Sequence, residues 1–179
     1  MNFHRDLPTA KGSDMPRLHF IAITLGFNLY WLLAVWGQFD YIWLLTVMLI
    51  GCWWTFRGSW RFAIIAGITG ISMDVLLSYF GVYQFAGNVF PLWLILLWLG
   101  FSSFVWLVRK VIRNYPPYVL VIMGSIGGMI SYWAGFRLEA VSWPLGIPAT
   151  VIILLVAWLV YSMILLVLLK KCIHRWGEG

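Results

Sequence analysis

The sequence predicts an all-α integral membrane protein built as a bundle of six transmembrane helices. Of its 179 residues, 63% are hydrophobic and 10% are charged, and the mean hydropathy is +0.90. Soluble domains are about one quarter charged. Six apolar runs reach or approach the roughly 17 to 25 helical residues that cross a bilayer. The basic residues gather at alternate ends of these runs, which predicts that both termini are cytoplasmic.

The expected spans follow one another with short connections. They cover residues 20–36, 41–56, 62–80, 91–108, 118–135 and 147–169. The first span ends in AVWGQ, without a small-x-small cleavage site, so we expect it to be retained. The resulting division is a cytoplasmic N-terminal arm at 1–19, one six-helix membrane domain at 20–170 and a cytoplasmic tail at 171–179.

The basic residues determine the expected orientation. If the six spans alternate in direction, every Lys and Arg except Arg137 falls on one side of the membrane. Short loops rich in Lys and Arg stay in the cytoplasm, so loops 56–61 and 109–117 are expected there. Because these residues are scattered along span ends, the net charge of +6 indicates topology and no nucleic-acid partner.

Small residues form a stripe along each of two spans, with a spacing of three and four. In the third span Asp74 lies within the stripe, and in both spans such a face favours close helix approach in lipid. We therefore expect the third and fifth spans to be neighbours, or these faces to bind other membrane proteins or a second copy of the chain. The stripe residues are Gly67, Gly70 and Ser78 in the third span, and Gly124, Gly128, Ser131 and Gly135 in the fifth.

Asp74 is the feature with the greatest functional content. It lies 13 residues after Arg61, or about 20 Å along the helix, and so roughly 10 Å beneath the outer edge of the hydrocarbon core. An unpaired carboxylate at that depth costs several kcal/mol, so it must be paired, protonated or facing a wet cavity. Arg137, the one outward arginine, is the expected partner, and Glu139 competes for it.

Two interpretations of Asp74 remain open. In the first, a pair with Arg137 locks the third and fifth spans together. In the second, an outward-facing cavity binds a polar head group or relays a proton. The residues of that candidate polar cavity are Asp74, Arg137, Glu139, Tyr83, Gln84, Asn88 and Trp93. Trp98 and Trp158 lie in the middle of spans, where they either line a cavity or face lipid.

The sequence assigns no cofactor, no metal and no reaction. Cys52 and Cys172 lack a CxxC partner, and His4, His19 and His174 have no neighbour at metal-ligand spacing. There is also no GxSxG, Walker or HExxH motif. Whether the protein is an enzyme stays open at this point.

The segments DVLLSYFGVYQF (74–85) and PLWLILLWLGF (91–101) resemble the central signature of a bacterial inner-membrane family catalogued as domain of unknown function 2878. FNLYWLLAVWG (27–37) and YWAGFRLEAV (132–141) match its order and spacing. The resemblance implies a small multi-pass protein of the bacterial inner membrane, with a link to membrane-lipid modification or stress response. It supplies no site residues, and Glu139 stands where the family pattern has a small residue.

Three hypotheses for function follow. The first is a lipid-associated protein with an outer-leaflet cavity around Asp74 and Arg137. The second is a small transporter or permease component, in which Asp74 carries a proton or binds a cationic solute; the absence of an internal repeat gives it less support. The third is a structural or scaffolding subunit, in which Asp74 and Arg137 serve assembly alone.

Overall fold

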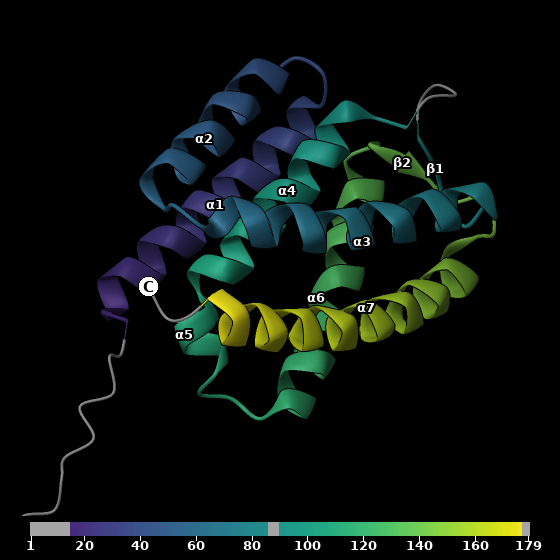
Figure 1. Ribbon diagram of the computed structural model, residues 1–179. Helices are drawn as coiled ribbons and strands as arrows, with labels where there is room; N and C mark the ends of the chain where they lie inside the picture. Colours follow the sequence, from purple (N-terminus) through teal and green to yellow (C-terminus); the bar gives the residue numbers. More distant parts are fainter. Residues whose placement is uncertain (1–14, 86–89, 177–179) are drawn as a thin grey trace, which may run out of the picture.

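A computed structural model describes residues 15–85 and 90–176 (Figure 1). This part of the chain is helical apart from its connections and one two-stranded ribbon, so the expected helical class is confirmed. The elements are α1 (Arg17–Gly37), α2 (Ile42–Thr55), α3 (Ser59–Tyr79), β1 (Gln84–Phe85), α4 (Leu92–Leu107), α5 (Arg109–Ile112), α6 (Pro117–Arg137), β2 (Val141–Ser142) and α7 (Ile147–Trp176).

Helices occupy all six positions where spans were expected, but they differ in length. Among the described residues, α1, α3, α6 and α7 are long and apolar enough to cross a membrane. Helices α2 and α4 have 14 and 16 residues, or about 21 and 24 Å, which is shorter than a hydrocarbon core of about 30 Å. The chain is therefore a helical, membrane-embedded protein with four helices of spanning length. Helix α7 also continues to Trp176, into the segment expected to be a tail.

Glycine and proline set the boundaries of several helices. Gly58, before α3, and Gly146, before α7, have φ of +100° and +76°, a left-handed conformation that glycine adopts without a steric cost. Pro91 and Pro116 are the N-caps of α4 and α6, where a missing N–H removes no helical hydrogen bond. The helices consequently begin close to the residues that the sequence indicated.

The small-residue face of α3 packs against α4. A Cβ atom added at Gly70 would overlap the Trp98 ring, and one added at Gly67 would lie 3.1 Å from the Leu99 side chain. Asp74, one turn after Gly70, is on the same face. This face therefore packs mainly against α4, and its contact with the fifth span, α6, comes through the hydrogen bond between Asp74 and Tyr132.

The small-residue face of α6 packs against α7 in the same manner. A Cβ atom at Gly128 would overlap the Trp158 ring, and one at Gly124 would overlap the Ser162 hydroxyl. The pattern of small residues showed which faces pack closely. It could not show the partner, because the partner supplies large side chains that have no spacing signature of their own.

The short ribbon lies at one end of the bundle, beside the end of α3 and the start of α7 (Figure 1). Strands β1 and β2 are antiparallel, with Gln84 opposite Ser142 and Phe85 opposite Val141. Helix α5 and the last turns of α7 lie at the opposite end. The ribbon thus ties the connection after α3 to the connection after α6.

Candidate functional site

Asp74 is fully buried and accepts hydrogen bonds from three aromatic side chains. The Tyr83 hydroxyl donates to Oδ1 at 2.6 Å, and the Tyr132 hydroxyl donates to the same oxygen. The Trp98 indole N–H donates to Oδ2 at 2.7 Å. Because these donors come from α4, α6 and the residues before β1, one carboxylate connects α3 to three other parts of the fold.

These three bonds compensate for burying the carboxyl group. Hydrogen bonds to a charged group contribute about 1.5–3 kcal/mol each, and placing a carboxylate within a bilayer costs several kcal/mol. The favourable free energy of the three hydrogen bonds is similar in size to the cost of burying the carboxylate. Asp74 therefore needs no cation. Its donors are neutral aromatic side chains, which also fill the surrounding apolar space.

The structure does not show the expected pair between Asp74 and Arg137. Arg137 is exposed, and the carboxyl oxygens of Asp74 are occupied by the three aromatic donors. The reason lies in the geometry of α6. Arg137 follows Tyr132 by five residues, which turns it roughly 140° around a helix of 3.6 residues per turn. When Tyr132 faces Asp74, Arg137 must face elsewhere.

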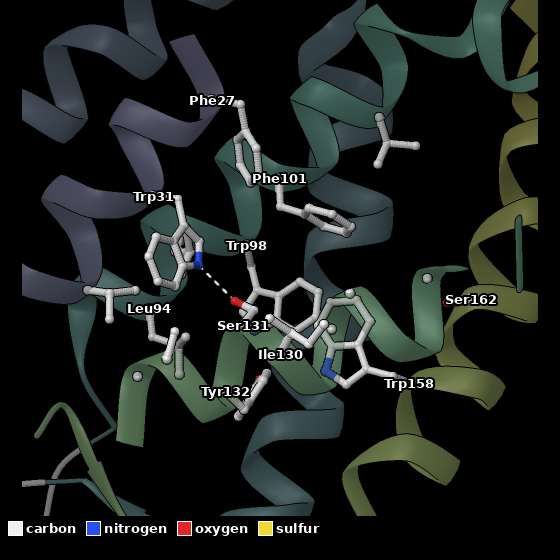
Figure 2. A pocket seen from close by; sticks show the side chains of 18 of the residues that line it. Phe27, Trp31, Leu94, Trp98, Phe101, Ile130, Ser131, Tyr132, Trp158 and Ser162 are labelled. Carbon is white, nitrogen blue, oxygen red and sulfur yellow. Dashed lines mark hydrogen bonds between the residues drawn. The ribbon is translucent and has the colours of Figure 1, made fainter. Parts of the chain in front are cut away.

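A cavity of about 600 Å³ lies between α1, α4, α6 and α7. Figure 2 shows its side chains, with Trp31 and Ser131 joined by a hydrogen bond and Trp98 beside Trp158. The lining is mainly apolar and aromatic. It comprises Phe27, Asn28, Trp31 and Val35 of α1; Trp93, Leu94, Leu97, Trp98, Phe101 and Val105 of α4; Leu120, Met123, Gly124, Gly127, Gly128, Ile130, Ser131, Tyr132, Ala134 and Gly135 of α6; Trp158, Ser162, Leu165 and Leu166 of α7; and Phe85, Ile112, Ala140 and Val141.

Asp74 stands behind the wall of this cavity. Its partners Trp98 and Tyr132 are lining residues, whereas Asp74 itself is not. The hydrogen bonds fix the orientations of the Trp98 indole and the Tyr132 ring. Asp74 is therefore a positioning residue, since it acts on anything in the cavity through the two rings that it holds.

The wall around Trp98 is a packed aromatic cluster. The Trp98 and Trp158 rings are stacked with centroids 5.5 Å apart and planes at 19°. Phe101 meets both rings edge-on at 5.8 Å, and Tyr161 meets them at 5.0 and 5.4 Å. Such interlocked rings form a rigid surface, because none can turn without displacing another.

Few polar groups reach the cavity. The Trp31 indole N–H donates to the Ser131 hydroxyl at 2.8 Å, and the Asn28 amide donates to the Thr24 carbonyl at 2.8 Å. Trp31 and Ser131 are thus bonded to each other, and the Asn28 amide is bonded to the backbone. The cavity follows α6 from Leu120 to Gly135, or about 22 Å of helix. Its volume lies in the ordinary range for ligand sites, and its length and lining suit an elongated apolar molecule.

The described residues of the expected polar cavity are divided among three places. Asp74 and Tyr83 are bonded to each other, and Trp93 is buried and lines the apolar cavity. Gln84, Arg137 and Glu139 line a separate depression at the ribbon, together with Phe85, Phe136, Val141 and Ser142. Asn88 lies outside the described residues.

The remaining residues of the two stripes have individual positions. Ser78 is half-buried on α3, Ser131 accepts the hydrogen bond from Trp31, and a Cβ atom at Gly135 would lie 3.8 Å from Val35.

Within residues 15–85 and 90–176, no group of three His, Cys, Asp or Glu is placed to hold a metal ion.

Sequence reasoning missed Tyr132 as a partner of Asp74. It also left Trp98 and Trp158 between two interpretations, and the structure shows that both line the cavity. The Trp98 indole N–H finds an acceptor in Asp74, as buried indoles usually do, whereas the buried indole N–H of Trp158 has no hydrogen-bond partner among the described residues.

Comparison with known proteins gives a family but no activity. The family model described as a protein of unknown function (DUF2878) matches residues 20–164. No curated protein matches the chain. No solved structure matches it either.

Proposed function

Since the chain belongs to the DUF2878 family of proteins of unknown function, we propose its function from its own site: it binds the apolar chain of a lipid or isoprenoid in the cavity between α1, α4, α6 and α7. The observation that carries this proposal is the cavity itself, about 600 Å³ in volume and apolar along its length. Asp74 contributes by holding Trp98 and Tyr132 in its wall.

The surroundings of the cavity support a ligand taken from the bilayer. The outer faces of α1 and α6 carry exposed apolar side chains, among them Leu25 and Leu29 on α1 and Ile122 and Ile126 on α6. In lipid, an apolar chain gains no hydrophobic free energy by entering a protein, so binding depends on close packing. The interlocked rings around Trp98 and Trp158 provide a firm surface for that packing.

The same proposal includes the cellular setting. We place the protein in the bacterial inner membrane with six spans, both termini cytoplasmic and the β1–β2 ribbon on the outer side. The resemblance to the family and the distribution of basic residues support this topology. The bound lipid is the proposed link to membrane-lipid modification or stress response.

A transport role finds less support in the geometry. A proton or cation carrier at Asp74 requires a path from the carboxylate to water. Asp74 is instead fully buried beneath three side chains that occupy both of its oxygens.

The proposal is tested by filling the cavity. Gly127 lines it, and a Cβ atom there meets nothing within 4 Å, so Gly127→Leu is the substitution chosen to place a side chain in this space. Gly51→Leu on α2 is the matched control, because Gly51 also has nothing within 4 Å and does not line the cavity.

Lipid retained by each purified protein is counted by native mass spectrometry as the detergent concentration rises. We expect wild type and Gly51→Leu to retain lipid equally, and Gly127→Leu to lose most of it. Equal retention by all three proteins would show that the cavity is not a lipid site.

A further inference from the structure

The depression at the ribbon adjoins the lipid cavity. Phe85 and Val141 line both, and they are directly opposite each other in the ribbon. A molecule that fills the cavity to this end therefore arrives beside the polar residues of the depression. The inference drawn here rests on the proposed lipid-binding function.

The depression contains one positive and one negative side chain. Arg137 and Glu139 both line it and are exposed. In the part of the chain that the structure describes, neither side chain takes part in an ion pair or hydrogen bond. Two opposite charges thus stand close in the sequence and share one depression, yet each is available to a ligand.

The backbone holds Glu139 in an unusual conformation. Helix α6 ends with a Schellman motif, in which the Ala140 N–H bonds the Gly135 carbonyl and the Glu139 N–H bonds the Phe136 carbonyl. The motif places Glu139 at φ +59°, where glycine is the usual residue. A glutamate there is less favourable than a glycine.

In the proposed topology, the depression lies at the depth of lipid head groups. Helix α6 has 21 residues, or about 31 Å, which matches the hydrocarbon thickness. Arg137 is its last residue and so reaches the boundary between acyl chains and head groups. An arginine binds phosphate through paired N–H groups, and a carboxylate binds an ammonium group.

We propose that Arg137 and Glu139 hold the head group of a zwitterionic phospholipid with a primary ammonium group, such as phosphatidylethanolamine. The phosphate lies on Arg137 and the ammonium on Glu139, and an acyl chain passes Phe85 and Val141 into the cavity. In this arrangement one molecule pairs with both charged side chains. Its polar head lies in the depression at the ribbon, and its apolar chain lies in the apolar cavity beyond.

The experiment compares three phospholipids that share the same acyl chains. The protein is placed in nanodiscs with equal amounts of phosphatidylethanolamine, phosphatidylglycerol and phosphatidylcholine, and the retained lipid is identified by native mass spectrometry. Since an exposed ion pair is modest, we expect wild type to prefer phosphatidylethanolamine over phosphatidylglycerol by about two- to fivefold. Phosphatidylcholine, whose quaternary ammonium has no N–H, is expected to bind less well than phosphatidylethanolamine.

The variants separate the two charges. Glu139→Gln is expected to abolish the preference for phosphatidylethanolamine over phosphatidylglycerol while total lipid retention stays near wild type. Arg137→Gln is expected to weaken all three phospholipids. Soluble glycerophosphoethanolamine is added as a competitor, and failure to displace the lipid is expected because it lacks the acyl chains.

Two results would overturn the head-group assignment and leave the lipid cavity in place. One is wild type that retains lipid, loses it on Gly127→Leu, and shows no preference among the three head groups. The other is a preference that persists unchanged in both Arg137→Gln and Glu139→Gln. Loss of all lipid retention, with no difference between wild type and Gly127→Leu, would overturn the proposed function together with this inference.

Discussion

Trp98 of α4 donates its indole N–H to Asp74 of α3 at 2.7 Å, and the same ring lies over Gly70, one turn earlier on α3. The glycine leaves space for the ring, and the carboxylate fixes its direction. Residues four apart share a helix face, so Gly70 and Asp74 together form a docking position for one tryptophan. This relationship explains why an acid lies within a stripe of small residues.

Replacing Asp74 by leucine is expected to destabilise the protein strongly. The change leaves three buried donors without an acceptor, at a cost of about 1–3 kcal/mol each. Asp74→Asn is expected to cost much less, because its amide oxygen can face the Trp98 N–H while its NH₂ group donates to the oxygens of Tyr83 and Tyr132. The measurement is the thermal unfolding temperature of the purified protein in detergent.

If the negative charge of Asp74 were itself required, Asp74→Asn would unfold at as low a temperature as Asp74→Leu. That result would show that hydrogen bonding alone does not explain the role of Asp74 in stability. Lipid retention by Asp74→Asn provides a further readout, and we expect it to stay close to wild type because Trp98 and Tyr132 keep their positions.

Adjacent glycines on α6 provide a second test. A Cβ atom at Gly128 would overlap the Trp158 ring, whereas one at Gly127 meets nothing within 4 Å. Gly128→Ala is therefore expected to destabilise the protein by about 1–3 kcal/mol, the usual cost of overpacking. Gly127→Ala is expected to be neutral or stabilising by up to about 1 kcal/mol, through helix propensity.

Unfolding of both alanine variants is followed by the same thermal assay. The pair shares one substitution on one helix, so differences in helix propensity cancel. Equal unfolding temperatures would mean that α6 and α7 do not pack through Gly128 and Trp158.

The sequence allowed the helices to be predicted more fully than their contacts. Apolar runs indicated six helices at the correct places, because length and hydropathy are local properties. The need of Asp74 for partners also followed from its place within an apolar run. Partner choice did not follow, since it depends on helix rotation: Arg137 has the opposite charge, but five residues after Tyr132 it faces away from Asp74. Neutral aromatic donors carry no charge signal that would favour them in advance.

The proposed topology predicts where introduced cysteines react. Ser142 in β2 and Asn114 after α5 are both exposed, and we place them on the outer and cytoplasmic sides. In a background that carries Cys52→Ala and Cys172→Ser, Ser142→Cys is expected to react with a membrane-impermeant maleimide on intact cells. Asn114→Cys is expected to react only after the cells are opened.

Labelling of both cysteines on intact cells would contradict the six-span topology. The comparison is informative because α2 and α4 are shorter than a typical span. If α4 did not cross the membrane, the loop that contains Asn114 and the connection before α4 would lie on the same side.

The hydrogen bond between Trp31 and Ser131 joins α1 to α6 across the cavity (Figure 2). Such bonds between membrane helices contribute about 0.6 kcal/mol on average. Ser131→Ala removes the acceptor and leaves the Trp31 ring free to move, so bound lipid is expected to exchange about two- to threefold faster, as that energy implies. Exchange is measured by displacement of a pyrene-labelled phospholipid from the protein in nanodiscs.

Ser162→Ala is the matched control, because Ser162 also lines the cavity but is not bonded to α1. Faster exchange in Ser131→Ala alone would show that the contact between Trp31 and Ser131 controls lipid exchange, whereas equal rates in the two variants would show that it does not.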